Sequence, residues 1–227
     1  MAVPTVLATA TTNTAAATSH AVDLPTHSEG DLLLMVLEVG ADRTATVSDW
    51  TEVFVRSASA GAFRVYCFAK IAGASEGATK TAALSGSAAV LAAVSAISGA
   101  ANIGTTPIVA GSAGGLSGSS HNAPSIVATD SDSLIIAGAA DAGGTSYSGA
   151  LSGYTNIANL GNATSFDDMT VFSRDTGAAA GTVNAVTVSA DTSQSWVAFQ
   201  LAVAPTSGGG GSAIPAFVHH RKLLGVQ

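Results

Sequence analysis

A serine motif is the one pattern in the sequence that resembles a catalytic site. Residues 73–77, Gly-Ala-Ser-Glu-Gly, match the G-x-S-x-G pattern of a serine nucleophile. Such a nucleophile needs a strand before it, a helix after it, and an Asp and a His later in the chain. Here residues 79–84 have the pattern of a strand, and the related segment 177–181 carries Ala179 where the motif has Ser75. The sequence therefore predicts a hairpin turn in place of a hydrolase, and no enzyme.

Side chains that could bind a metal are present without the spacing of a metal site. The aspartates do not show the D-x-D-x-D-G order of a calcium-binding loop. The histidines stand far apart in loop-like contexts and form no H-x-H or H-E-x-x-H pair. We therefore expect no metal and no cofactor, and turn positions for these aspartates: Asp130, Asp132, Asp167, Asp168 and Asp191. The histidines concerned are His20, His27 and His121.

Two aromatic residues are the candidate ligand-facing side chains. Trp50 and Tyr154 both stand just before a predicted strand. Exposed aromatic rings can stack on sugars, which would give a glycan-binding site. The alternative is that each ring closes the core at a corner between loop and strand, because large aromatic side chains are scarce here and dominate burial. The core position is the interpretation we favour.

Composition limits the class of protein that these residues can belong to. The 227 residues are 10% charged, with a net charge of −7, 25 Gly and a mean hydropathy of +0.42. An acidic chain of this kind excludes the basic surface of a nucleic-acid-binding protein, and its hydropathy argues against disorder. Residues 88–101 are apolar but too short to span a bilayer, and residues 1–20 lack the features of a signal peptide. We expect a protein made in a cytoplasm, with no membrane or nucleic-acid partner.

The chain contains an internal repeat. Segments in the first half match segments in the second half in the same order, displaced by about 102 to 106 residues. The match predicts that Leu33 is equivalent to Ile135 and that Val94 is equivalent to Gln200. The segment 194–203 alternates apolar with small or polar residues, as a half-buried strand does. Its partner, residues 87–101, is Ala-rich and could be a helix if taken alone, but the equivalence favours a strand.

The repeated segments predict an all-β fold. Short strands separated by Gly, Ser, Asp and Asn clusters, without a periodic helix, indicate a β-sandwich, here a jelly-roll-like one built from two similar halves. Cys67 is the single cysteine; within residues 63–71 it should share a buried face with Val65, with Tyr66 and Phe68 on the other face. Whether the halves form one domain or two stays open, although one shared core is favoured by their size.

The predicted organisation has five parts. Residues 1–19 form an N-terminal extension, and residues 20–205 form the duplicated sandwich, with halves 20–104 and 122–205. Between them, the Gly- and Ser-rich residues 105–121 are expected to be a surface connection. Residues 206–212 are a flexible linker by composition, native or engineered, and they lead to a tail of residues 213–227.

The tail is the predicted partner-binding element. It is both apolar and basic on a body that is otherwise acidic, and it is too short to form a core. A tethered apolar peptide is suited to docking on another protein, although a disordered end without a role is the alternative. The residues expected to contact the partner are Ile214, Phe217, Val218, Arg221, Lys222, Leu223 and Leu224.

Several of these segments resemble virion proteins of tailed bacteriophages. The resemblance rests on Gly-Asp-Leu-Leu-Leu at 30–34, on Trp50, on the closing segment 196–205 and on the Ala, Gly, Ser and Thr bias. It implies a structural protein of the virion, of the tail fibre, spike, baseplate or head-decoration type, present in symmetric multiple copies. The implied partners are capsid, portal or tail subunits and copies of the chain itself. The alternative is a receptor-binding or glycan-binding adhesin domain that contacts a host surface glycan.

Overall fold

The computed structural model describes residues 2–101, 108–143, 147, 150–162 and 167–206, and these residues form almost entirely β-strands. The first half forms one sheet in the order β1-β6-β2-β5-β4, with the short β3 paired to β6. A 3₁₀ turn at Ser59–Gly61 joins β4 to β5. The strands of this half are β1 Thr5–Asp23, β2 Leu32–Val39, β3 Ala45–Val47, β4 Thr51–Ser57, β5 Arg64–Ile71 and β6 Thr79–Ser98.

The second half repeats the arrangement of the first. Its main sheet has the order β11-β12-β10-β15-β7, and two short pairs, β13-β9 and β14-β8, lie beside it. Read from β7, each strand occupies the place of its counterpart in the first sheet, with β10 central as β2 is. The strands are β7 Ile108–Gly115, β8 Ser120–Ala123, β9 Ile126–Ala128, β10 Ser133–Asp141, β11 Thr155–Asn162, β12 Asp167–Ala178, β13 Gly181–Val183, β14 Val186–Ser189 and β15 Trp196–Val203.

The strand register confirms the repeat. Leu33 of β2 pairs with Lys70 and Ala96, and its predicted equivalent Ile135 pairs with Arg174 and Ala202. In the same way, Val94 lies opposite Met35, and Gln200 lies opposite Ala137, in each case two pairs further along the strand. The all-β sandwich of two similar halves is therefore confirmed, and the Ala-rich residues 87–101 belong to strand β6.

Two segments that were expected to lie outside the sheets are strands. Residues 1–19, predicted to be an extension, contribute most of β1, which pairs with β6 along its length. Residues 105–121, predicted to be a surface connection, contain β7, which pairs with β15, and the start of β8. Both predictions were wrong because hydrogen bonds to a neighbouring strand order these Thr-, Ala- and Gly-rich segments, which have little apolar alternation of their own.

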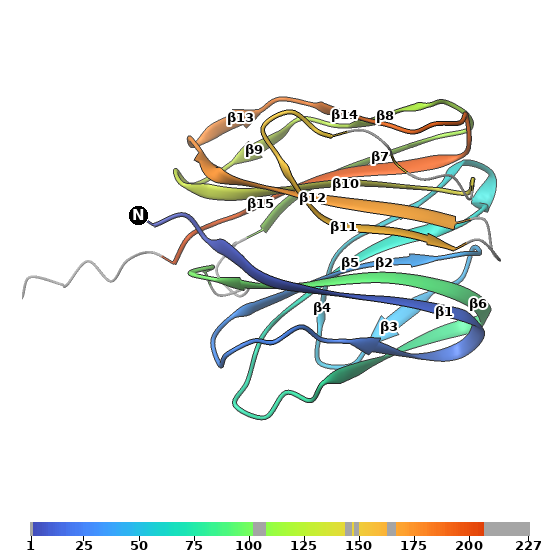
Figure 1. The fold of residues 1–227 in the computed structure, drawn as a ribbon, viewed down its shortest axis with the longest axis horizontal. Helices are drawn as coiled ribbons and strands as arrows, with labels where there is room; N and C mark the ends of the chain where they lie inside the picture. Colours follow the sequence, from blue (N-terminus) through green and yellow to red (C-terminus); the bar gives the residue numbers. More distant parts are fainter. Residues whose placement is uncertain (1, 102–107, 144–146, 148–149, 163–166, 207–227) are drawn as a thin grey trace, which may run out of the picture.

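The halves are stacked as layers, with the first half below the second in Figure 1. Each main sheet is buried on both faces, which is why β2 and β10 read as continuous apolar runs. In the first half, one face of the main sheet packs against β3 and the far ends of the long strands β1 and β6. In the second half, one face packs against the short strands β8, β9, β13 and β14. The other two faces meet in a shared core that includes Leu34, Val36, Ile136, Phe199 and Leu201.

Cys67 lies in this shared core with its thiol buried, together with Val65. Tyr66 and Phe68 point into the core of the first half, so the predicted division of faces is confirmed. Burial raises the pKa of the Cys67 thiol far above its usual range. The cysteine is therefore a small packed side chain between the two sheets.

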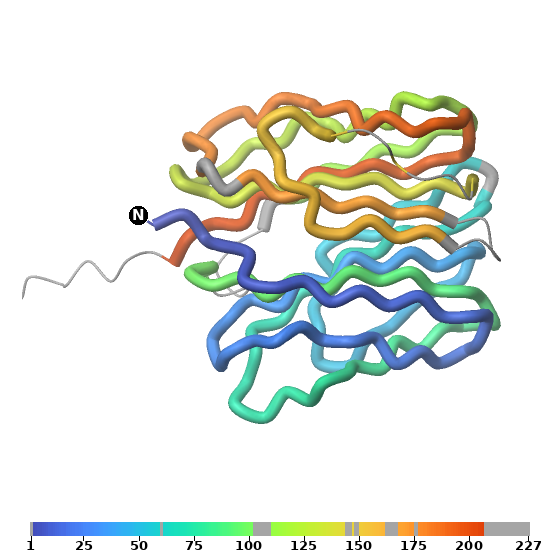
Figure 2. Tube along the Cα trace, viewed as in Figure 1, coloured from blue at the N-terminus to red at the C-terminus, as the bar shows by residue number. Residues whose placement is uncertain are grey.

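Both ends of the described chain lie at the same end of the body, at the left of Figure 2. There Ala100 and Pro205 form an isolated β-bridge, and the Thr206 N–H donates to the Gly99 carbonyl oxygen at 2.7 Å. The closing strand is thus fixed by hydrogen bonds up to the residue at which the predicted linker begins.

Candidate functional site

The two candidate aromatic residues occupy equivalent corners but differ in burial. Thr51 pairs with Ala69, and Thr155 pairs with Ser173. Trp50, just before Thr51, therefore lies beside Lys70 of β5, and Tyr154, just before Thr155, lies beside Arg174 of β12. Trp50 is 9% exposed and packs within the core of the first half, as the favoured interpretation expects. It is therefore closed to a ligand. Its equivalent Tyr154 is half-buried at the margin of the second half and borders an open pocket.

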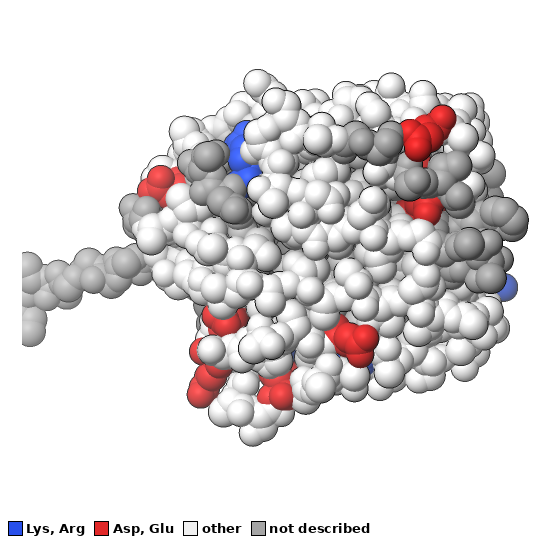
Figure 3. All heavy atoms as spheres, in the orientation of Figure 1, with Lys and Arg blue, Asp and Glu red and all other residues white. Residues whose placement is uncertain are grey.

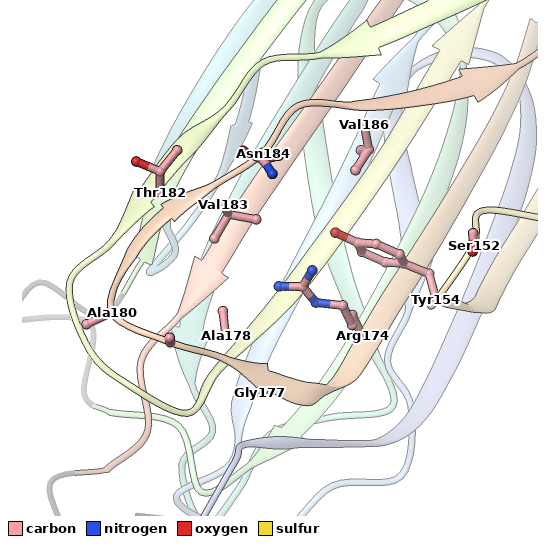
Figure 4. A pocket seen from close by; sticks show the side chains of 11 residues that line it. Ser152, Tyr154, Arg174, Gly177, Ala178, Ala180, Thr182, Val183, Asn184 and Val186 are labelled. Atoms are coloured by element: carbon pink, nitrogen blue, oxygen red, sulfur yellow. The ribbon is translucent and has the colours of Figure 1, made fainter.

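The pocket beside Tyr154 has a volume of about 450 Å³. One wall of the pocket is the outer face of the main sheet, to which Arg174 on β12 contributes. The other wall is the segment that leads from β12 through β13 to β14. In Figure 4 the Arg174 side chain reaches toward Ala178 and Val183, and the Tyr154 ring lies beside it. The other lining residues are Ser152, Gly177, Ala179, Ala180, Thr182, Asn184 and Val186.

Arg174 supplies the charge of this pocket. Its guanidinium carbon lies 5.5 Å from the centroid of the Tyr154 ring, a cation–π distance. Within the described part of the chain, Arg174 has no ion pair, and its buried Nε has no hydrogen-bond partner. The buried Tyr154 hydroxyl likewise has no partner among these residues. Burial raises the pKa of Tyr154, and the positive charge of Arg174 partly opposes that shift.

A second cluster, around His121, lies inside the second half. His121 is on β8, fully buried, and stacks on Trp196 with 5.3 Å between ring centroids. Its Nδ1 lies 3.1 Å from the Tyr147 hydroxyl and its Nε2 2.9 Å from the Gly118 carbonyl oxygen. Asp141 is 4.0 Å from the same Nδ1 and is also fully buried. Burial lowers the pKa of His121.

This cluster was not predicted, since His121 was expected in a loop. Its partners come from positions far apart in the sequence, and no local spacing announces them. Although His, Asp and Tyr could together move a proton, the complete burial of His121 and Asp141 keeps a substrate from reaching them in this structure. We interpret the cluster as a polar network that joins the outer strands to the main sheet.

The remaining candidate residues have ordinary structural surroundings. Ser75 is exposed in the turn between β5 and β6, and a strand follows it. The turn is not a hairpin as expected, because β5 and β6 lie on opposite sides of β2. His20 contacts Thr14 and Ala17, and His27 contacts the Pro25 carbonyl. Among the described residues, no three His, Cys, Asp or Glu side chains are grouped to hold a metal ion.

The predicted partner-binding residues of the tail lie outside the described residues. They are Ile214, Phe217, Val218, Arg221, Lys222, Leu223 and Leu224. The described body presents a different kind of surface. On the face seen in Figure 3 most atoms belong to uncharged residues, and the acidic groups stand apart from one another.

No family model, curated protein or solved structure matches the chain. In the described part of the structure there is no helix of the length and hydropathy needed to cross a membrane. The candidate site therefore has to be interpreted from its own geometry and from the comparison between the two halves.

Proposed function

We propose that the protein is a structural component of a bacteriophage virion, anchored to the particle by its C-terminal tail. The observation that carries the proposal is how the described body is closed at residues 205 and 206. The Ala100–Pro205 bridge and the Thr206–Gly99 hydrogen bond fix the end of the body, which is already closed by the buried strand β15. The apolar residues beyond the Gly/Ser linker are therefore not needed to complete the described cores.

The chemistry of the tail suits docking on another virion subunit. Fully burying one large apolar side chain contributes about 1.5–3 kcal/mol before ordering costs. The tail offers five such side chains, Ile214, Phe217, Val218, Leu223 and Leu224. Together they could offset the entropy of fixing a short peptide. Arg221 and Lys222 would orient the tail against acidic groups, and several copies on one particle would add avidity.

The body supports the same proposal as a building block. Its two sheets are locked by a shared core, and its surface carries few charges. A rigid body of this type can be repeated by the symmetry of a capsid, portal or tail. We therefore place the protein in the virion, after synthesis in the host cytoplasm, with other virion proteins and its own copies as partners.

Truncation tests the proposal. A chain ending at Thr206 keeps the Pro205 bridge and the Thr206 hydrogen bond, so its melting temperature should match that of the full chain. It should fail to join particles that recruit the full chain. As a matched control, Arg221 and Lys222 are replaced by Gln in the full chain, which should weaken recruitment less than truncation does. Full occupancy by the truncated chain would place the interface on the sandwich and contradict the docking role.

A second candidate function is adhesion to a host surface glycan. The observation that favours it is the open pocket beside Tyr154, since the equivalent corner at Trp50 is closed. A glycan array probed with the purified chain distinguishes the two functions, because a purely structural subunit gives no sugar-dependent signal.

A further inference from the structure

The two halves treat equivalent cations differently, and the difference points to a ligand. Lys70 and Arg174 occupy the same place in the two sheets, opposite Leu33 and Ile135. In the first half, Lys70 forms an ion pair with Glu76, six residues later in the chain. This interaction lowers the pKa of the Glu76 carboxyl group. The first half thus neutralises its cation with its own carboxylate.

In the second half no carboxylate stands at the position equivalent to Glu76. Gly77 and Gly181 are equivalent in the repeat, so the residue equivalent to Glu76 is Ala180. Ala180 lines the pocket in which Arg174 lies. An Ala side chain offers Arg174 no acceptor. A cation that its counterpart pairs internally is therefore left facing about 450 Å³ of open space.

We propose that this pocket binds the carboxylate of an acidic sugar, with Arg174 taking the role that Lys70 has toward Glu76. A guanidinium presents a planar fork of N–H donors that matches a carboxylate in a bidentate manner, which an ammonium group does not. The exchange of Lys for Arg thus accompanies the loss of the internal acceptor. The inference goes beyond the virion role proposed above and does not require it.

The size and lining of the pocket favour a sugar over a smaller anion. Ligand sites commonly have volumes of about 300–1,000 Å³, and this pocket exceeds the space that a carboxylate alone would fill. Ser152, Thr182 and Asn184 are exposed along its margin and can exchange hydrogen bonds with hydroxyl groups. The Tyr154 ring borders the same space.

The test compares two sugars that differ in charge. D-glucuronate and its neutral amide, D-glucuronamide, are titrated into the ¹⁵N-labelled full chain, and backbone amide shifts are followed by NMR. We expect glucuronate to shift the signals of residues 174–184 in a saturable manner. Glucuronamide should bind at least about tenfold more weakly than glucuronate, because a charge-assisted hydrogen bond is replaced by a neutral one.

Variants assign the binding to this pocket. Arg174→Gln removes the cation, and Ala180→Glu restores the internal carboxylate of the first half; each should weaken glucuronate binding about tenfold or more. Lys70→Gln removes the equivalent cation of the first half and should leave the affinity unchanged. Folding of each variant is checked by its melting temperature, and Ala180→Glu keeps the test valid if Arg174→Gln does not fold.

Three results would overturn the inference. They are no saturable shift with glucuronate, equal binding of glucuronate and glucuronamide, and an affinity in Ala180→Glu that equals that of the original chain. These measurements use isolated sugar and protein, so their outcome is independent of whether the chain joins a particle.

Discussion

The shared core should make the two halves unfold together, and Phe199 is the residue with which to test this. Phe199 on β15 is fully buried between the sheets, and its ring centroid lies 5.6 Å from that of Phe54 on β4 of the other half. Truncating a buried Phe to Ala costs about 3–5 kcal/mol. Total stabilities of folded proteins are about 5–15 kcal/mol, so Phe199→Ala should remove a large fraction.

Each half carries one tryptophan, which provides the assay. In a Trp196→Phe background, Trp50 reports on the first half, and in a Trp50→Phe background, Trp196 reports on the second. With a urea dependence of about 1–3 kcal/mol per M, Phe199→Ala should lower both midpoints by roughly 1–5 M. The exposed Leu116 is the control, since Leu116→Ala should change stability by less than about 0.5 kcal/mol.

The result that would refute this reasoning is a separate response of the halves. If Phe199→Ala lowers the midpoint reported by Trp196 and leaves that reported by Trp50 unchanged, the halves are independent domains. The shared core would then contribute little to the stability of the first half.

Three further predictions concern single sites. Cys67 should react slowly with a thiol reagent in the native protein and quickly in urea; fast native labelling would contradict its burial. Gly138→Ala should lower the unfolding free energy by about 1–3 kcal/mol, because the new Cβ would contact the Phe199 ring and lie 2.6 Å from a backbone oxygen. The control is Gly73→Ala, whose Cβ would meet nothing within 3.4 Å and which should leave the stability unchanged. The folded pKa of His121 is below its usual 6.5, so the unfolded chain binds the proton first and stability falls as pH drops below about 6.5. In urea titrations at several pH values, His121→Gln should reduce the loss of unfolding free energy at low pH. If the variant loses as much stability as the original chain, His121 is not the cause of the pH dependence.

The repeat was the part of the fold that the sequence predicted best. Equivalent positions share the same neighbours in the sheets, so landmarks such as Leu33 and Ile135 could be aligned before any strand was placed. The alignment also decided between helix and strand for the Ala-rich residues 87–101, which propensity alone could not do. Here a relation between distant segments supplied what local pattern lacked.

Strand β7 shows why part of the fold could not be predicted. Its Gly-rich end has the composition of a loop, but the glycines are there because the backbone passes close to other groups. A Cβ on Gly114 would lie 3.0 Å from the Trp196 carbonyl oxygen, and one on Gly111 would lie 2.8 Å from Ile126. Such close approaches are set by residues about 15 or 80 positions away, which no local pattern reveals.

The candidate site was predicted only in part, for a related reason. Tyr154 could be singled out as an aromatic residue at a corner. Its difference from Trp50 depends on what surrounds each ring, and the pocket depends on a small residue, Ala180, where the other half has Glu76. The signal that could have found it was the same repeat, had its ion pairs been compared as well as its strands.

The packing of the halves has the form of a two-fold interface within one chain. Strand β1 lies against β11, and β4 lies against β7, with Asn13 donating to the Gly161 carbonyl oxygen at 3.1 Å. Because β1 is the counterpart of β7 and β4 the counterpart of β11, each contact is the other with the halves exchanged. This is the self-complementary relation of a symmetric dimer. Joining both copies in one chain keeps that interface formed at any concentration and leaves each outer corner free to diverge, as those at Trp50 and Tyr154 have done.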